Sequence, residues 1–311
     1  MSDLNIFYSR LAMVGIIMLL GLFLGKIRWI SESTNKQLIN ILLLVAMPAA
    51  LFSAFPADFD QAALSNFLFG LGAGALVLGA LAILGKLLFN KHTLKNTSRY
   101  SRNESQFALI FNNAAFLGLP LVLTIFGPEA MMPYCGFIIP FNLGLFGYGV
   151  YLMQGKFDRK LFISTLLNPN IIAVALGAAF FILPVALPEI LTMSVSSVAG
   201  MMTPLSLICI GYMLSRADLK KLIKKKRLFI TALVQLTIGP LATFGILYLL
   251  GAPADVRNIL VLIQALPTAT SLGLFAEKYG GDPISASELV VISTILSIVT
   301  LPIMLGFLMT W

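Results

Sequence analysis

The chain has few of the residues on which enzymes and metal proteins depend. Its 311 residues include one histidine, two cysteines and 13 acidic residues. The cysteines, Cys135 and Cys209, lie in apolar segments, and His92 lies in a basic loop. Two cysteines and one histidine supply neither a disulfide framework nor a metal site.

Acidic residues are also scarce inside the apolar segments. Every aspartate falls in a terminus or a predicted loop, so the chain lacks the embedded aspartate pair of an intramembrane aspartyl protease. A serine or zinc protease of the membrane would need histidine within the membrane. We therefore expect no enzymatic activity and no cofactor.

Apolar sequence dominates what is present. Hydrophobic residues make up 59% of the chain, charged residues 11%, and the mean hydropathy is +0.94. The charges form short clusters between apolar runs of about 18 to 25 residues, which is the length that crosses a bilayer as a helix. The sequence therefore predicts an all-α integral membrane protein with ten spans, at 5–25, 37–56, 63–89, 103–126, 131–153, 169–188, 195–214, 228–250, 257–276 and 285–310.

The positive charges lie after every second span. Most lysines and arginines fall in the loops that follow spans one, three, five and seven, and the intervening loops carry almost none. This is the positive-inside pattern, so we expect a multi-pass protein of the cell membrane with both termini on the non-cytoplasmic side. The net charge of +8 is thereby explained without a nucleic-acid partner. The run "RADLKKLIKKKR" is interpreted as a topology determinant, with binding of anionic lipid or a partner as the alternative.

Two halves of the chain share three landmarks at nearly one spacing. Pro48 and Pro204 are 156 residues apart, the two "LGL" triplets at 117–119 and 272–274 are 155 apart, and Pro128 and Pro283 are 155 apart. This predicts an internal repeat, residues 1–155 and 156–311. Five spans per repeat place the second copy in the opposite orientation, which is the inverted architecture of many secondary transporters.

Spans four and nine are interrupted by polar residues, glycine and proline. The interruptions read "FNNAAFLGLP" at 111–120 and "IQALPTATSLG" at 263–273, and each lies about 15 Å into its span, near the bilayer midplane. Proline breaks a helix and leaves a new half-helix N-terminus with free N–H groups and partial positive charge. Two such ends facing each other would bind an anion. The predicted substrate-binding residues are Asn112, Asn113, Gly118, Pro120, Gln264, Pro267, Thr268, Thr270 and Ser271.

A plainer interpretation is that proline and glycine only kink these helices and that asparagine joins neighbouring ones. We prefer it for Pro140, Pro240 and Pro302. Glu104 and Glu288 begin their spans and are expected at the interface, which leaves no buried carboxylate to bind a coupling proton. Residues expected to line a cavity are Pro48, Thr203, Pro204, Ser206 and Asn142.

Four motifs together resemble the auxin efflux carrier family, which includes plant PIN-FORMED carriers and bacterial malonate and malate permeases. They are "INILLLVAMPAALF" (39–52), "NNAAFLGLPLVLTIFG" (112–127), "LLNPNIIA" (166–173) and "ALPTATSLGLFAEKYGGDPISASELVVISTILSIVTLPI" (265–303). The long hydrophilic loop between the repeats of plant members is missing here.

The resemblance implies the fold of the bile-acid/sodium symporters. In that fold spans four and nine cross at their breaks, and a panel domain of spans one, two, six and seven moves relative to the crossover. Asn113, Gly118, Pro120 and Pro267 match crossover positions. A small organic acid as substrate and a homodimer are further implications.

We therefore expect a secondary transporter of small organic anions that works by alternating access in the lipid bilayer. A non-transporting membrane sensor or scaffold, or an anion channel, are the alternatives. Coupling to H⁺ or Na⁺ and uniport driven by membrane potential are all open at this point.

Overall fold

The computed structural model describes residues 3–56, 58–90, 99–183, 187–216 and 225–308. The expectations for His92 and for most of the basic run at 216–227 concern residues outside these ranges.

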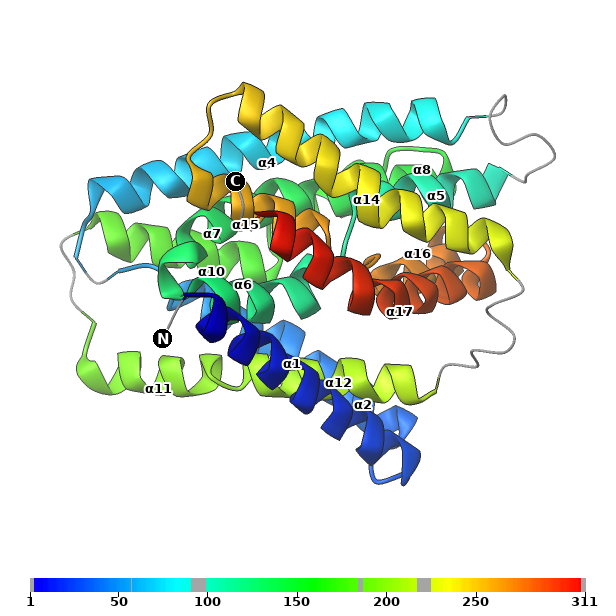
Figure 1. The fold of residues 1–311 in the computed structure, drawn as a ribbon. Coiled ribbons are helices and arrows are strands. Elements are labelled where there is room, and N and C mark those ends of the chain that lie inside the picture. The colour runs from blue at the N-terminus through cyan, green and yellow to red at the C-terminus, as the bar shows by residue number, and fades with distance from the viewer. Residues whose placement is uncertain (1–2, 57, 91–98, 184–186, 217–224, 309–311) are drawn as a thin grey trace. The chain divides into compact units, whose positions relative to one another are not determined.

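Helices make up most of the described part of the chain, in which no strand occurs (Figure 1). Their bounds are α1 Asp3–Lys26, α2 Glu32–Ile41, η1 Leu42–Ala46, α3 Met47–Phe52, α4 Gln61–Leu88, α5 Arg99–Ile110, η2 Ala114–Gly118, α6 Leu119–Phe126, η3 Pro128–Ala130, α7 Met131–Gly144, η4 Leu145–Gly149, α8 Val150–Gln154, α9 Arg159–Thr165, α10 Pro169–Ile182, α11 Glu189–Ala199, α12 Met202–Ser215, α14 Lys226–Leu249, α15 Ala254–Gln264, α16 Ser271–Tyr279 and α17 Pro283–Leu308.

The all-α membrane class is confirmed for these residues. Six helical segments are long and apolar enough to cross a membrane, or seven if α9 and α10 form one broken span. Predicted spans four and nine are absent from this count because each is divided into short helices. The arrangement of ten spans in two groups of five stays a prediction.

Proline and glycine interrupt the helices near two predicted kinks. The turns Leu42–Ala46 widen to a π-helix directly before Pro48. In the second half, α11 ends at Ala199 and α12 begins at Met202, two residues before Pro204. Such widened or broken turns are the usual way in which a helix accommodates a proline.

The chain divides into two compact units. Unit 1 contains Met1–Asn66, Ala115–Cys135 and Leu167–Ala217, and unit 2 contains Phe67–Ala114, Gly136–Leu166 and Asp218–Trp311. Each unit combines segments from both predicted repeats. Unit 1 includes the four spans that the resemblance assigns to a panel domain, together with α6 from the second half of span four.

Small residues allow close packing in unit 1. Helices α1 and α12 lie side by side, and a Cβ atom on Gly21 would collide with the carbonyl oxygen of Ile208. Helices α10 and α3 make a related contact, in which a Cβ on Gly177 would lie 3.2 Å from the carbonyl oxygen of Phe52. Close backbone approach through glycine is the usual means by which membrane helices associate, because lipid provides little hydrophobic force between them.

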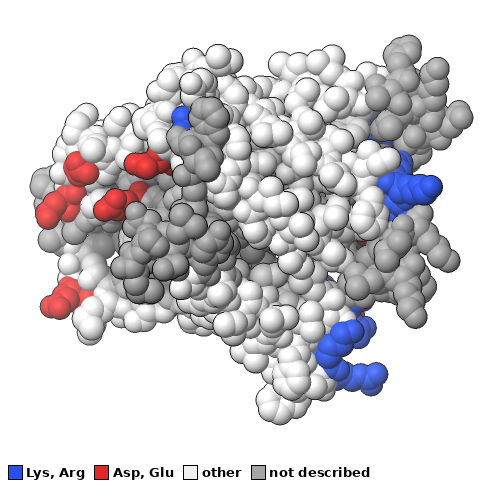
Figure 2. All heavy atoms as spheres, viewed as in Figure 1, with Lys and Arg blue, Asp and Glu red and all other residues white. Residues whose placement is uncertain are grey.

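Unit 2 is built around α14, which packs against α5, α15 and α17. Helix α16 packs against α17, α5 and α8. Helix α7 approaches α4 closely at Gly136, where a Cβ would collide with the carbonyl oxygen of Phe67. Uncharged side chains cover most of the described surface on the face of the molecule in Figure 2. Which ends of the helices face the cytoplasm stays a prediction.

Replacing Gly21 by Ala should destabilise the protein. The added methyl group meets backbone rather than a flexible side chain, so we expect a loss of about 1–3 kcal/mol, the usual range for overpacking. Gly15, on the same helix, has no neighbouring atom within 4 Å of its would-be Cβ. Gly15→Ala should therefore be neutral or slightly stabilising. Thermal unfolding in detergent compares the two, and equal melting temperatures would contradict the close packing of α1 on α12.

Candidate functional site

Both predicted breaks occur, with different local geometry. In span four α5 ends at Ile110, residues 111–113 leave the helix, and α6 begins at Leu119 after a π-helical segment. In span nine α15 ends at Gln264 and α16 begins at Ser271. We expected each new helix to start directly after its proline, and neither does. Pro120 lies within the first turn of α6, where a missing N–H is tolerated, and three residues separate Pro267 from α16.

The two breaks pair with each other inside unit 2. Asn112 and Thr268 form an isolated antiparallel β-bridge. The Asn113 N–H donates to the carbonyl oxygen of Pro267 at 2.7 Å, and the Ala269 N–H donates to that of Phe111 at 3.1 Å. These N–H groups are therefore used within the protein rather than directed at a ligand. The expected anion site has fewer free backbone donors than the sequence suggested.

The pairing determines the directions of the helices on either side of the breaks, which are the arms of the crossover. The chains are antiparallel at the bridge, and α16 then packs against α5. The α15 arm instead packs against α14 and α17. The beginnings of α5 and α15 consequently lie at opposite ends of the crossover.

Two buried glutamines hold the crossover together. Gln264 donates through Nε2 to the carbonyl oxygen of Leu109 at 2.9 Å, and its Oε1 accepts from Asn112 Nδ2 at 2.9 Å. Gln235, on α14, donates to the carbonyl oxygen of Leu266 at 2.6 Å and accepts from Thr268 Oγ1 at 3.0 Å. Gln264 is 1% exposed and Gln235 is fully buried.

Two residues that contact the crossover, Gln235 and Ser293, were not predicted. Gln235 is a lone amide in the apolar run "TALVQLTIGP", and an uncharged polar residue at that depth was the available signal. Ser293, on α17, accepts from the Thr268 N–H at 3.1 Å. Serine in a membrane helix commonly bonds its own helix, so its sequence position did not indicate this role.

Asn112 retains an unused acceptor. The carbonyl of Leu109 requires the Nε2 of Gln264, so the Oε1 of Gln264 faces Asn112, and Asn112 must present its Nδ2. Its Oδ1 is buried and has no hydrogen-bond partner among the described residues. A buried acceptor without a donor costs about 1–3 kcal/mol. The atom is suited to accept from an O–H or N–H group, or to coordinate a cation.

The other predicted binding residues are distributed over both units. Asn113 is 5% exposed and lies in the paired segment of unit 2. Thr270 and Ser271, at the beginning of α16, are half-buried. Gly118 and Pro120 are buried and belong to unit 1.

The expected cavity-lining residues are engaged within their own helices or near the surface. Asn142 Nδ2 donates to the carbonyl oxygen of Ile138 at 2.8 Å. Ser206 is fully buried and donates to the carbonyl oxygen of Thr203 at 3.1 Å. Thr203 and Pro48 are half-buried and Pro204 is exposed.

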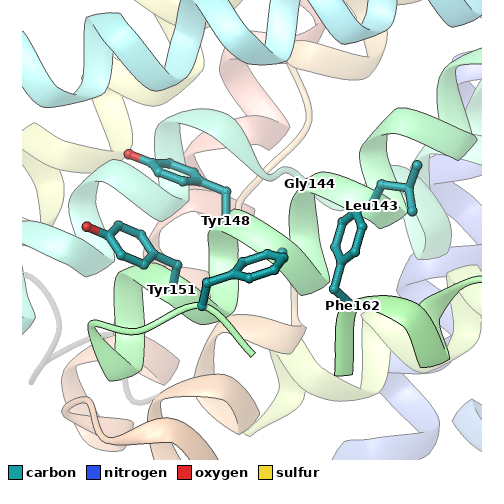
Figure 3. Close-up of a pocket in the computed structure, with 7 residues that line it drawn as sticks. Leu143, Gly144, Tyr148, Tyr151 and Phe162 are labelled. Carbon is teal, nitrogen blue, oxygen red and sulfur yellow. The ribbon is translucent and has the colours of Figure 1, made fainter. Parts of the chain in front are cut away.

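One hollow in unit 2 lies outside the predicted set. It has a volume of about 380 Å³ and is lined by aromatic and small residues, Leu143, Gly144, Gly147, Tyr148, Tyr151, Phe157 and Phe162. The rings of Tyr148 and Tyr151 stack at 5.9 Å, and Phe162 lies across the hollow from them (Figure 3). No residue of the predicted binding set contributes to its lining.

The expectation for Glu104 is wrong. Its side chain was predicted to reach the interface, yet it is 2% exposed, and Oε1 accepts from the Asp282 N–H at 2.8 Å. The reason is a contact distant in sequence, because the turn after α16 folds over the first turns of α5. Glu288 is half-buried and forms an ion pair with Lys225 at 2.7 Å.

Gln264→Leu should destabilise the folded protein. It leaves both the Leu109 carbonyl and Asn112 Nδ2 without these partners in a buried position, at a cost of about 1–3 kcal/mol for each. Gln154→Leu is the matched control, because Gln154 bonds the Lys156 carbonyl near the surface. Melting temperatures in detergent should fall clearly for the first variant and hardly for the second. Similar shifts would contradict the role of Gln264 at the crossover.

Known proteins resemble this chain over almost its whole length. The model of the family described as membrane transport protein matches residues 6–154 and 150–305. An uncharacterized transporter of Methanothermobacter thermautotrophicus is 24% identical over 293 residues, which cover 93% of this chain and 94% of the relative. The resemblance drawn from the four motifs is thereby confirmed. The chain belongs to the membrane transport protein family, that of the auxin efflux carriers, and is a multi-pass membrane transporter.

Proposed function

We propose that this protein is a secondary transporter of small organic anions and that it carries them by an elevator-like movement of unit 2. The observation behind the proposal is the buried pairing of two interrupted spans, with polar side chains at the break. Backbone without helical hydrogen bonds is tolerated at membrane depth only where protein or a water-filled cavity surrounds it. In secondary transporters such interruptions form the binding site.

The donors left for a carboxylate are mainly side chains. The backbone N–H groups of Asn113 and Ala269 are used in the pairing, so the anion would be held by the half-buried hydroxyls of Thr270 and Ser271. Ser271 begins α16, where the helix dipole favours negative charge.

Asn112 Oδ1 adds a preference among organic acids. A fully ionised carboxylate has no proton to offer this acceptor, whereas a hydroxy acid or a half-protonated dicarboxylic acid does. Malate and the monoanion of malonate both meet this requirement. We propose that such acids are the preferred substrate class.

The division into compact units supports a two-body mechanism. Unit 2 contains the paired breaks, and unit 1 contains the spans attributed by resemblance to the panel domain. Transporters that alternate access commonly move one helical bundle against the other.

Helix bounds support the inverted repeat of residues 1–155 and 156–311. Both ends of α1, Asp3–Lys26, recur 156 residues later in the segment from Arg159 to Ile182. The segment Pro128–Gln154 recurs as Pro283–Leu308. The bridged residues Asn112 and Thr268 are themselves 156 apart. We propose five spans per repeat, termini on the non-cytoplasmic side of the cell membrane and, from the resemblance, a homodimer.

Purified protein in liposomes should take up radiolabelled malate or malonate. We expect saturable uptake that is accelerated by unlabelled acid on the other side, because counterflow requires an alternating carrier. Uptake is measured by rapid filtration against empty liposomes. Specific binding without flux would replace transport by a sensor role, and unitary currents without counterflow would indicate a channel.

Asn112→Ala should weaken apparent affinity about tenfold, since one hydrogen bond in a dry site contributes about 1.5 kcal/mol. Asn35 is a matched control in unit 1: it is 6% exposed, and its Oδ1 also lacks a partner among the described residues. Asn35→Ala should change the KM of uptake less than twofold. Equal KM values for the two variants would remove Asn112 from the substrate site.

A further inference from the structure

Two charged side chains are buried in the part of the chain that the structure describes, Glu104 at 2% and Arg257 at 7% exposure. Both belong to unit 2. Ionisable groups are expensive to bury within a protein and often mark functional positions. The guanidinium of Arg257 lies over the rings of Phe244 and Tyr248, at 5.1 and 5.9 Å, which compensates part of its burial.

Glu104 has much less compensation. Its carboxylate accepts a hydrogen bond from the Asp282 N–H at 2.8 Å and forms no ion pair with a described lysine or arginine. The charged groups that act on it are Asp282, in the turn after α16, and Arg227, on α14. The guanidinium of Arg227 is itself bonded to Ser285 Oγ at 3.2 Å. Helix α8, which also packs on α5, carries no charged side chain.

The turn opposite Glu104 is shaped to meet it. Gly280 adopts φ +89°, a left-handed conformation that glycine accepts without strain. The N–H of Gly281 then donates to the carbonyl of Ala276 at 2.6 Å, and Asp282 begins the next helix by accepting from the Ser285 N–H at 3.2 Å. A Cβ atom on Gly281 would lie 3.3 Å from Glu104 Oε1. The carboxylate is thus held against the backbone at the end of the α16 arm.

The fold itself does not require a carboxylate here. The bridge relates Asn112 to Thr268, and the same spacing of 156 relates Glu104 to Leu260. Leu260 is apolar and 2% exposed. The corresponding position on the other arm is therefore filled by an ordinary core residue, and the charge of Glu104 needs a different explanation.

Other carboxylates of unit 2 are poor candidates for a buried ionisable site. Glu288 is paired with Lys225. The remaining described ones, Asp158, Asp255, Glu277 and Asp282, are exposed.

We propose that Glu104 is the proton-binding group that couples transport to a pH gradient, an inference that rests on the proposed transport function. On one side of the membrane the carboxylate takes up one proton and becomes a neutral carboxylic acid. On the other side it releases that proton to water and regains its charge. Since Glu104 and the paired breaks belong to the same compact unit, proton and anion travel together.

Protonation also changes the contact that Glu104 makes. A charged acceptor forms a hydrogen bond roughly twice as strong as a neutral one, so protonation weakens the bond from Asp282. The turn between α16 and α17 is then held less firmly. The cost of burying a charge disappears at the same time, which favours movement of the protonated unit through the low-dielectric part of the membrane.

The test compares two modes of malate transport in proteoliposomes. Counterflow at equal pH reports the carrier cycle, and accumulation driven by an acidic exterior reports coupling. Wild-type protein should show both. Glu104→Gln should keep counterflow within about twofold of wild type and lose the accumulation. Glu277→Gln, an exposed carboxylate on α16, is the matched control and should retain both activities.

Three outcomes would overturn the proposal: accumulation by Glu104→Gln, failure of an acidic exterior to drive accumulation by a wild-type protein that shows counterflow, or loss of counterflow in a Glu104→Gln protein that is folded. If that variant does not fold, Glu104→Asp keeps the carboxyl group and withdraws it by one methylene. Accumulation of malate should then persist, but the external pH at which it is half-maximal should shift. An unshifted midpoint would contradict the assignment. Absence of wild-type counterflow for malate and malonate alike would instead refute the transport function.

Discussion

The backbone pairing between the two interrupted spans is the constraint on which unit 2 depends. A break in a membrane helix leaves N–H and C=O groups that lipid cannot satisfy. Here the strands of backbone at residues 111–113 and 267–269 satisfy one another, and Gln264 and Gln235 bond the carbonyls at either side. Each break is tolerated because the other exists.

The helices inside unit 1 and those inside unit 2 are held together by different kinds of contact. In unit 1 glycines bring helix backbones into contact, and these contacts involve few polar side chains. In unit 2 buried amides and hydroxyls join helices around the paired segment. Close packing of helix faces needs no directional bonds, whereas the hydrogen-bonded centre of unit 2 defines one geometry. In this centre Asn112 Oδ1 has no hydrogen-bond partner among the described residues.

Much of this centre was predictable because its causes are local. Proline and paired asparagines inside apolar spans indicate a helix break, so the positions of both interruptions could be predicted from the sequence. The partners of the break did not follow, because Gln235 and Ser293 lie on other helices, and a single polar residue in an apolar run does not reveal what it faces. Glu104 was misplaced for the same reason: its donor, Asp282, lies 178 residues away in the chain. The number of spans was also harder to establish than their apolar character, since broken spans divide into short helices.

The distance along the chain between the paired segments has a consequence for biosynthesis. Span four leaves the ribosome about 150 residues before span nine, yet the Asn113 N–H and the Phe111 carbonyl find their partners only in span nine. During that interval the nascent chain must keep an open helix break in or near the bilayer, shielded by water, by a chaperone or by the translocation machinery. Completion of unit 2 is therefore a late event, and a chain truncated before Pro267 would lack the groups that close the first break.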